Sequence, residues 1–271
     1  MAQIDKPNTQ MNTVIYTGNG STQAVTGVGF QPDWTWIKCR NDAQEPRLVD
    51  SVRGTTKYLD SSLAIAELTD TNILTSFDTD GFTLGDDAIS NLNGNTHVAW
   101  NWKAGGTAVS NTDGTITSSV SANTTSGFSI VKYTGTGTNS DTVGHNLGTT
   151  PSMIIAKGLD AREWYVQHQA ISSGTLILNT NGAVSTSFPS GWINESPTSS
   201  VFSFTTGGGG TTNNVNNSGT DFIAYCFAEK KGFSKMGSYV GNGSADGNFV
   251  YLGFKPAFLI YKQSSASGES W

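Results

Sequence analysis

Three short glycine-containing stretches of this chain repeat one another, and no other feature constrains the fold as much. The stretches are Tyr16–Ser21 (YTGNGS), Tyr133–Thr138 (YTGTGT) and Tyr239–Ser244 (YVGNGS). About seventeen residues after each tyrosine, a proline opens an apolar run that ends in lysine, at Pro32–Lys38, Pro151–Lys157 and Pro256–Lys262. The spacing from proline to lysine is identical in all three, so chance similarity between turns is a poor explanation. The chain is therefore a tandem array of one module of about a hundred residues, with only the first part of a third copy.

The composition favours strands over helices. Of the 271 residues only 13% are charged, whereas 10% are aromatic and 32 are glycine. Short strands joined by tight polar turns suit this mixture, and long helices do not. Together with the repeat, it predicts an all-β chain of tandem antiparallel β-sandwiches of jelly-roll or lectin-like type. A wrapped trimeric β-structure is the alternative.

The repeat also predicts where the modules begin and end. We expect an N-terminal arm over residues 1–12, the first module over 13–106 and the second over 127–231. Residues 107–126, rich in Ser, Thr, Asn and Gly, are either a linker or an edge strand. Residues 232–271 begin a third module, which is incomplete. Ala64–Leu68 is the best candidate for a helical turn, and the asparagine-rich stretch Asn213–Asn217 is expected to be an exposed loop.

Charge and hydropathy argue against several partners. The net charge of −6 disfavours nucleic acid and anionic membrane surfaces. No apolar run approaches the roughly twenty residues that span a bilayer, and residues 1–7 lack the features of a signal peptide. We therefore expect synthesis in a cytoplasm without standard secretion. Cys39 and Cys226 have no partner at metal-ligand spacing and are expected to be buried free thiols.

No stretch has the spacing of a known catalytic motif, so an enzyme is not expected and no cofactor is implied. Asp78 and Asp80 are weak candidates for Ca²⁺ ligands, because aspartates are also common in hairpin turns. A glycosidase would need two neighbouring carboxylates. Candidate pairs are Glu163 with Glu195 and Glu45 with Glu67, but they do not repeat between modules.

Tryptophan side chains stack on sugar faces in lectins. The strand tryptophans fall at positions that are apolar in the other copies; Trp36, for example, corresponds to Ile155. They are therefore expected to pack in cores. Trp164 and Trp192 lie nearer to predicted loops and are the candidate carbohydrate-binding residues.

Several phrases resemble a known repeat family. They are Tyr16–Ser21, Phe30–Trp34 (FQPDW), Val52–Gly54 (VRG), Trp100–Gly106 (WNWKAGG) and Tyr225–Phe233 (YCFAEKKGF). This family of unknown function occurs in virion proteins of tailed bacteriophages, particularly those of marine podovirus type. The resemblance implies a structural virion protein, such as a tail fibre or appendage that contributes to host-surface attachment. A capsid decoration (head fibre) protein is the alternative. A polysaccharide-degrading depolymerase is the alternative from another class.

The same resemblance implies partners and location. We expect contacts with other virion proteins of the tail or capsid, with Ile4, Pro7 and Met11 of the arm as docking candidates. Host-surface glycans are a second expected partner. A homo-oligomer is expected, although no heptad pattern enforces one. The location would be the virion, assembled in the host cytoplasm, without nucleic-acid binding or membrane insertion.

Overall fold

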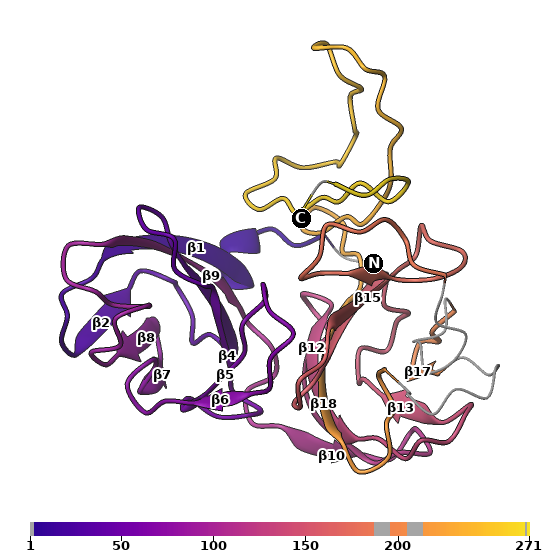
Figure 1. The fold of residues 1–271 in the computed structure, drawn as a ribbon, viewed down its shortest axis with the longest axis horizontal. Coiled ribbons are helices and arrows are strands. Elements are labelled where there is room, and N and C mark those ends of the chain that lie inside the picture. Colours follow the sequence, from indigo (N-terminus) through magenta and orange to yellow (C-terminus); the bar gives the residue numbers. More distant parts are fainter. Residues whose placement is uncertain (1–2, 187–195, 205–213, 269) are drawn as a thin grey trace.

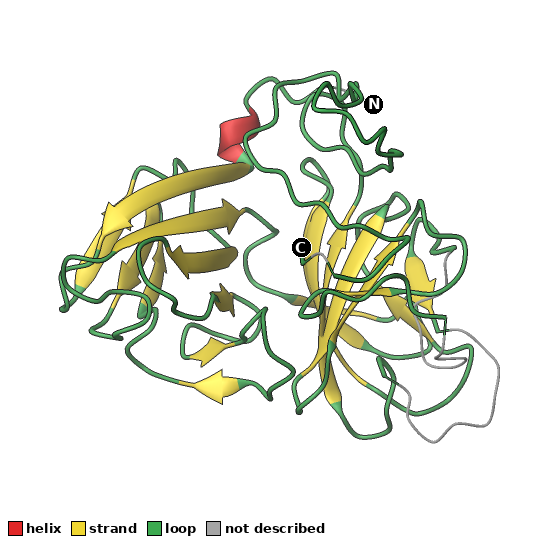
Figure 2. Cartoon of the chain, turned by 45° about the horizontal axis from the view of Figure 1, so that its top comes forward, coloured by secondary structure: helices red, strands yellow, loops and turns green. Residues whose placement is uncertain are grey.

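The structure is a computed structural model that describes residues 3–186, 196–204, 214–268 and 270–271. Apart from the single 3₁₀ turn η1 (Pro7–Thr9), the regular structure in these residues is β, and the paired strands run antiparallel. Figure 1 shows two lobes side by side, with residues 232–271 above them. Figure 2 shows the same division, with strands in both lobes and long loops between them. The expectation of an all-β, sandwich-type fold is confirmed.

The first lobe holds strands β1 to β9. Their bounds are β1 Met11–Thr17, β2 Gln23–Thr26, β3 Trp34–Cys39, β4 Arg47–Asp50, β5 Lys57–Tyr58, β6 Leu68–Thr69, β7 Ser76–Asp78, β8 Gly81–Leu84 and β9 Thr96–Trp102. A four-stranded sheet in the order β1-β9-β3-β4 faces a three-stranded sheet in the order β2-β8-β7. Apolar side chains from both sheets, including Tyr16, Val25, Ile37 and Phe82, fill the space between them.

The second lobe holds strands β10 to β18. Their bounds are β10 Val109–Asn111, β11 Ser118–Asn123, β12 Phe128–Thr134, β13 Thr142–Gly144, β14 Met153–Gly158, β15 Trp164–His168, β16 Leu176–Ile177, β17 Val201–Ser203 and β18 Asp221–Phe227. A seven-stranded sheet in the order β10-β11-β12-β18-β14-β15-β16 faces the pair β13-β17. The core between them includes Val131, Tyr133, Ile154 and Phe202.

The two lobes share one strand plan. In each, the closing strand (β9 or β18) pairs with the opening strand (β1 or β12) on one side and with the strand after the proline (β3 or β14) on the other. The small residues Ala99 and Ala224 take the same place in this plan, opposite Ile37 and Ala156 respectively. Alternate residues of each strand point to opposite faces of its sheet, so every main strand has an inner face toward its own core and an outer face.

Some local expectations need correction. Ala64–Leu68 contains no helical turn; Leu68 instead starts β6. Of the asparagine-rich stretch, Asn213 lies outside the described residues, whereas Val215 and Asn216 are buried rather than exposed. The reason is that this loop packs on the repeated turn of its own lobe, as described below.

One predicted boundary falls within a strand, and the predicted linker contains two strands. β1 begins at Met11, inside the predicted arm, and residues 107–126 contain β10 and β11, which extend the sheet of the second lobe. Within 232–271, the described residues contain no strand. The positions of the module boundaries themselves stay a prediction.

Candidate functional site

The repeated turn of the first lobe is held by the loop that precedes the closing strand. The Tyr16 hydroxyl donates to the Ser90 carbonyl oxygen at 2.6 Å. The side chain of Asn91 accepts from the Asn19 amide at 3.0 Å and donates to the Ser21 carbonyl at 2.6 Å. The Asn91 carbonyl also accepts from the Gly20 amide at 2.8 Å. One buried asparagine therefore satisfies backbone groups on both sides of the turn, which we call the asparagine clasp.

The second lobe has the same clasp. The Tyr133 hydroxyl donates to the Val215 carbonyl oxygen at 2.6 Å. The Asn216 side chain accepts from the Thr136 amide at 2.9 Å and donates to the Thr138 carbonyl at 2.8 Å. Two stretches distant in sequence thus make the same bonds twice. The turn is a structural closure that anchors the loop before the closing strand.

Close backbone approach explains the first glycine of each turn. A Cβ added at Gly18 would lie 2.3 Å from the Leu92 carbonyl oxygen, and one at Gly135 would lie 2.4 Å from that of Asn217. Neither glycine has a positive φ, so the glycine is required here because the loop comes so close, not because of backbone conformation.

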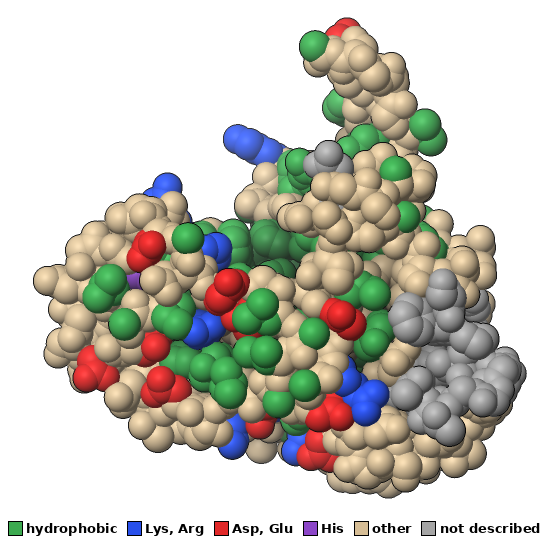
Figure 3. All heavy atoms as spheres, in the orientation of Figure 1, with side chains coloured by type: hydrophobic (Ala, Val, Ile, Leu, Met, Phe, Trp, Pro, Cys, Tyr) green, Lys and Arg blue, Asp and Glu red, His purple; other side chains and the backbone are tan. Residues whose placement is uncertain are grey.

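The outer faces of the two main sheets pack against each other between the lobes. Trp34 of β3 stacks on Tyr225 of β18 with ring centroids 4.4 Å apart, and Trp102 lies 6.5 Å from Phe128. The buried members of this interface cluster are Trp34, Leu48, Leu59, Trp102, Ala104, Phe128, Ile130, Ile155, Trp164, Val166, Leu176, Leu178, Ile223 and Tyr225. Figure 3 shows apolar side chains gathered in the notch between the lobes, below residues 232–271. Each sheet therefore has a core on both of its faces, which accounts for its apolar residues at successive positions.

A buried polar network crosses the same interface. The Arg53 guanidinium forms an ion pair with Asp50 at 2.6 Å and another with Glu67 at 3.2 Å. The Tyr225 hydroxyl, from the other lobe, donates to the Asp50 carboxylate at 2.8 Å. Burial acts to lower the pKa of Arg53, but the Asp50 carboxylate and its neighbours outweigh it and the pKa is raised. Burial, then the nearby Asp50 charge, raise the pKa of Tyr225 well above its usual value. The guanidinium and phenol are thus held in their protonated forms.

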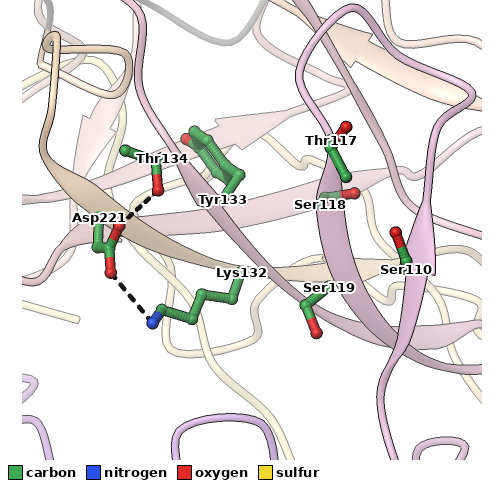
Figure 4. A pocket seen from close by; sticks show the side chains of 8 residues that line it. All are labelled: Ser110, Thr117, Ser118, Ser119, Lys132, Tyr133, Thr134 and Asp221. Carbon is green, nitrogen blue, oxygen red and sulfur yellow. Dashed lines mark hydrogen bonds and ion pairs between the residues drawn. The ribbon is translucent and has the colours of Figure 1, made fainter.

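A polar hollow of about 310 Å³ lies on the outer face of the second lobe. Figure 4 shows Lys132 paired with Asp221, and the Thr134 hydroxyl bound to the same carboxylate. Ser110 and Ser119 on the neighbouring strands line the other side. The hydrogen bond from Thr134, then the Lys132 charge, lower the pKa of Asp221 despite a cost of burial. Exposed hydroxyls and an ion pair can form hydrogen bonds with hydroxyl-rich ligands.

The proposed sugar-binding role of Trp164 is wrong. Its side chain is fully buried in the interface cluster, and its indole N–H donates to the Asp60 carbonyl oxygen of the other lobe at 2.8 Å. Trp164 is the first residue of β15. The first lobe covers its indole ring, which the sequence suggested would be exposed beside a loop. Trp192, the second candidate, lies outside the described residues.

The acidic candidates have local partners. The Asp80 carboxylate accepts from the amides of Gly27 and Gly29, and that of Asp78 accepts from the hydroxyls of Ser76 and Thr83. These bonds close the hairpin loops around β2, β7 and β8. Among the described residues, no group of three or more His, Cys, Asp or Glu side chains is placed to hold a metal ion.

The carboxylates considered for glycoside cleavage are engaged elsewhere or undescribed. Glu67 is paired with Arg53, Glu45 accepts from Ser62, and Glu163 accepts from Asn179. Glu195 lies outside the described residues. Cys39 and Cys226 are buried free thiols in the described structure, and burial raises the pKa of Cys226 to about 12.

The three docking candidates of the arm have different surroundings. The Ile4 amide donates to the Lys231 carbonyl at 3.3 Å, so this part of the arm lies against the end of the second module. Pro7 is exposed in η1, while Met11 opens β1 and packs against the interface cluster. Contact of the arm with a virion protein stays a prediction. The described part of the chain contains no helix with the length and apolar character needed to cross a bilayer.

Fold and interface together define a class: an all-β protein of tandem sandwich lobes that pack through the outer faces of their sheets. The chain matches, over residues 6–271, the model of a family described as a domain of unknown function, DUF7483. It therefore belongs to the DUF7483 family. Comparison with curated proteins and with solved structures found no match.

Two functional features escaped the sequence reasoning. The clasp asparagines, Asn91 and Asn216, had a signal in the sequence, since each stands eight residues before an equivalent alanine of the closing strand, Ala99 or Ala224. The Asp50–Arg53–Tyr225 network had none: Val52–Gly54 and Tyr225–Phe233 were singled out only for their family resemblance, and no pattern pairs Arg53 with Tyr225, 172 residues further along the chain.

Proposed function

We propose that this chain is a structural component of a bacteriophage virion, a tail-fibre or appendage protein that contributes to host-surface attachment. The observation that carries the proposal is the stiff junction between the lobes. An appendage must hold its tip at a set distance and angle from the particle, and lobes joined only by a flexible linker would not do so.

The junction supports this reading at the level of single contacts. The Trp34–Tyr225 stack and the Asp50–Tyr225 bond place two kinds of interaction on one residue. The connection between the lobes is pinned as well: the Asp33 carboxylate accepts from the Ala104 amide at 2.7 Å, and the Ser121 hydroxyl accepts from the Gly105 amide at 2.9 Å. The polypeptide between β9 and β10 therefore leaves the first lobe in one direction.

In this proposal, the polar hollow lies on the outside of the appendage, where it can contact the host surface. Its Lys132–Asp221 pair and the hydroxyls of Ser110, Ser119 and Thr134 suit weak binding of surface glycans. Many copies on one particle would turn such weak contacts into firm attachment. The attachment is non-enzymatic in this proposal.

Cryo-EM of the virions of the phage that encodes this chain, with mass spectrometry of the same particles, tests the proposal. We expect the chain among the virion proteins and two-lobed density in the tail appendages. Density on the capsid would favour the decoration alternative. Absence of the chain from purified virions would overturn the proposal, and release of reducing ends from host polysaccharide would overturn its non-enzymatic part.

A further inference from the structure

Residues 239–244 form the repeated turn for a third time, without a clasp. The Ser244 amide donates to the Asn242 side chain at 3.0 Å, as the Ser21 amide does to Asn19 at 2.8 Å. Gly243 has a φ of 67°, against 68° at Gly20. The local conformation of the turn is therefore present although no asparagine of a closing loop lies on it in the described structure.

Gly241 is the informative residue, because it corresponds to Gly18 and Gly135. A Cβ at either of those positions would meet a loop carbonyl at 2.3 or 2.4 Å, whereas a Cβ at Gly241 would meet nothing within 4 Å. The φ of Gly241 is not positive either. Glycine is thus unnecessary here for the described conformation, and is explained if a closing loop docks on this turn.

The face of this segment that corresponds to the core is open. Tyr239 is 59% exposed, whereas Tyr16 and Tyr133 are 8% and 2% exposed. Counting from the proline, Leu259 and Tyr261 take the positions of the buried Ile154 and Ala156, yet they are 69% and 64% exposed.

The outer face of the third copy already packs against the interface cluster. Phe258 and Ile260 correspond to Met153 and Ile155, and all four pack in or against the interface cluster. The Phe258 ring lies 5.4 Å from that of Trp102 in an edge-on contact. The third copy thus turns its outer face to the other two, as they do to each other, and leaves its core face to solvent.

We propose that this core face, formed by Tyr239, Gly241, Leu259 and Tyr261, binds a closing segment of the same repeat type. The closing segment has the chemistry of residues 214–227. It contains an asparagine in a loop, followed by an antiparallel strand. The core-facing residues of this strand are one aromatic residue and then two small ones, as in Phe222, Ala224 and Cys226. The asparagine clasps the turn at Gly241, and the strand pairs beside residues 256–262. The inference is independent of the proposed virion function.

The test uses the full chain and a synthetic peptide of residues 214–230. We expect saturable binding with one peptide per chain in fluorescence anisotropy, and hydrogen-exchange protection confined to residues 239–262. Peptide Asn216→Ala should bind at least about tenfold more weakly, because it loses both side-chain bonds of the clasp. Peptide Ser218→Ala is the matched control, since Ser218 is exposed in the second lobe.

A pair of glycine variants makes the test sharper. Gly241 and Gly247 both have open space around a would-be Cβ and neither has a positive φ, so replacing either by alanine should leave the free chain folded. Gly241→Ala should weaken peptide binding at least about tenfold, because the incoming carbonyl would clash with the methyl group. Gly247→Ala should bind as the parent does.

Three results would overturn the proposal. One is no binding of the peptide by the folded chain. Another is protection only within the second lobe, which would mean strand exchange there. The third is a homodimer in which residues 239–262 of two copies pair with each other without peptide, since the core face would then be covered by its own equivalent and not by a closing segment.

Discussion

The Tyr225 hydroxyl of the second lobe donates a hydrogen bond to the Asp50 carboxylate of the first lobe at 2.8 Å, inside the interface cluster. Asp50 also accepts from the Arg53 guanidinium at 2.6 Å. The bond between Tyr225 and Asp50 links the closing strand of one lobe to the edge strand of the other. Removing either the hydroxyl of Tyr225 or the charge of Arg53 is therefore the first test.

Tyr225→Phe should lower the free energy of unfolding by about 1–3 kcal/mol, since a buried acceptor loses one donor while the ring packing stays. Arg53→Met should cost more, about 3–5 kcal/mol, because it leaves Asp50 buried and uncompensated. Chemical denaturation measures both. Lys235→Met, which removes an exposed pair with Glu229, is the control and should change stability by less than about 1 kcal/mol. Equal effects of the three variants would contradict the role of the network.

The asparagine clasp gives a second prediction. Asn91→Ala and Asn216→Ala should each lower the free energy of unfolding by about 1–3 kcal/mol, because buried amide and carbonyl groups of the turn lose their partners. Hydrogen exchange should speed up at the turn of the affected lobe only. Asn242→Ala changes the turn of the third copy, on which no closing loop lies in the described structure. This substitution should therefore leave global stability unchanged. A loss from Asn242→Ala as large as the other two would argue against the clasp.

The turn glycines give a third. Gly18→Ala and Gly135→Ala should each destabilise the chain by about 1–3 kcal/mol or more, since the added methyl group would overlap a backbone carbonyl that cannot swing away. Thermal unfolding followed by circular dichroism measures the loss. Gly182→Ala is the control, because its nearest contact is a side-chain oxygen at 3.6 Å. Full stability of Gly18→Ala would show that the loop yields.

A fourth prediction concerns acid. His97 stacks on Tyr16 with ring centroids 5.0 Å apart, and burial lowers its pKa. Burial lowers the pKa of His145 as well. Below about pH 6.5 the unfolded chain binds protons at these positions while the folded chain does not. The free energy of unfolding should therefore fall as the pH drops from about 6.5, by up to about 1.4 kcal/mol per pH unit for each histidine, until the lowered folded pKa is reached.

The second lobe supplies the matched variant for this prediction. Phe222 takes the place of His97 and stacks on Tyr133 with ring centroids 5.3 Å apart. His97→Phe should keep the ring stack and reduce the slope of stability between pH 6.5 and 5.5 when urea melts are compared. The difference isolates His97, because the other titrating groups are common to both proteins. An unchanged slope would mean that His97 binds protons equally in the folded and unfolded chains, against the lowered pKa.

The sequence alone determined the all-β class and showed which stretches repeat. These follow from local chemistry: glycine at fixed positions, proline before a strand, and apolar residues at successive strand positions. It also placed the strand tryptophans in packed positions, because Trp36 corresponds to Ile155. It could not distinguish a core within a lobe from a core between lobes, since both demand apolar side chains.

Only the tertiary structure decided what each face meets. Trp164 seemed free because it lies beside a loop in sequence, but the first lobe covers it and accepts its indole N–H at Asp60. Asn216 seemed to belong to an exposed loop, yet it is buried on the turn at Tyr133. Burial and polar pairing depend on residues roughly eighty to more than a hundred positions away, and neither composition nor strand periodicity carries that information. The repeat predicts which residues are equivalent, while packing decides which copies are closed and which remain open.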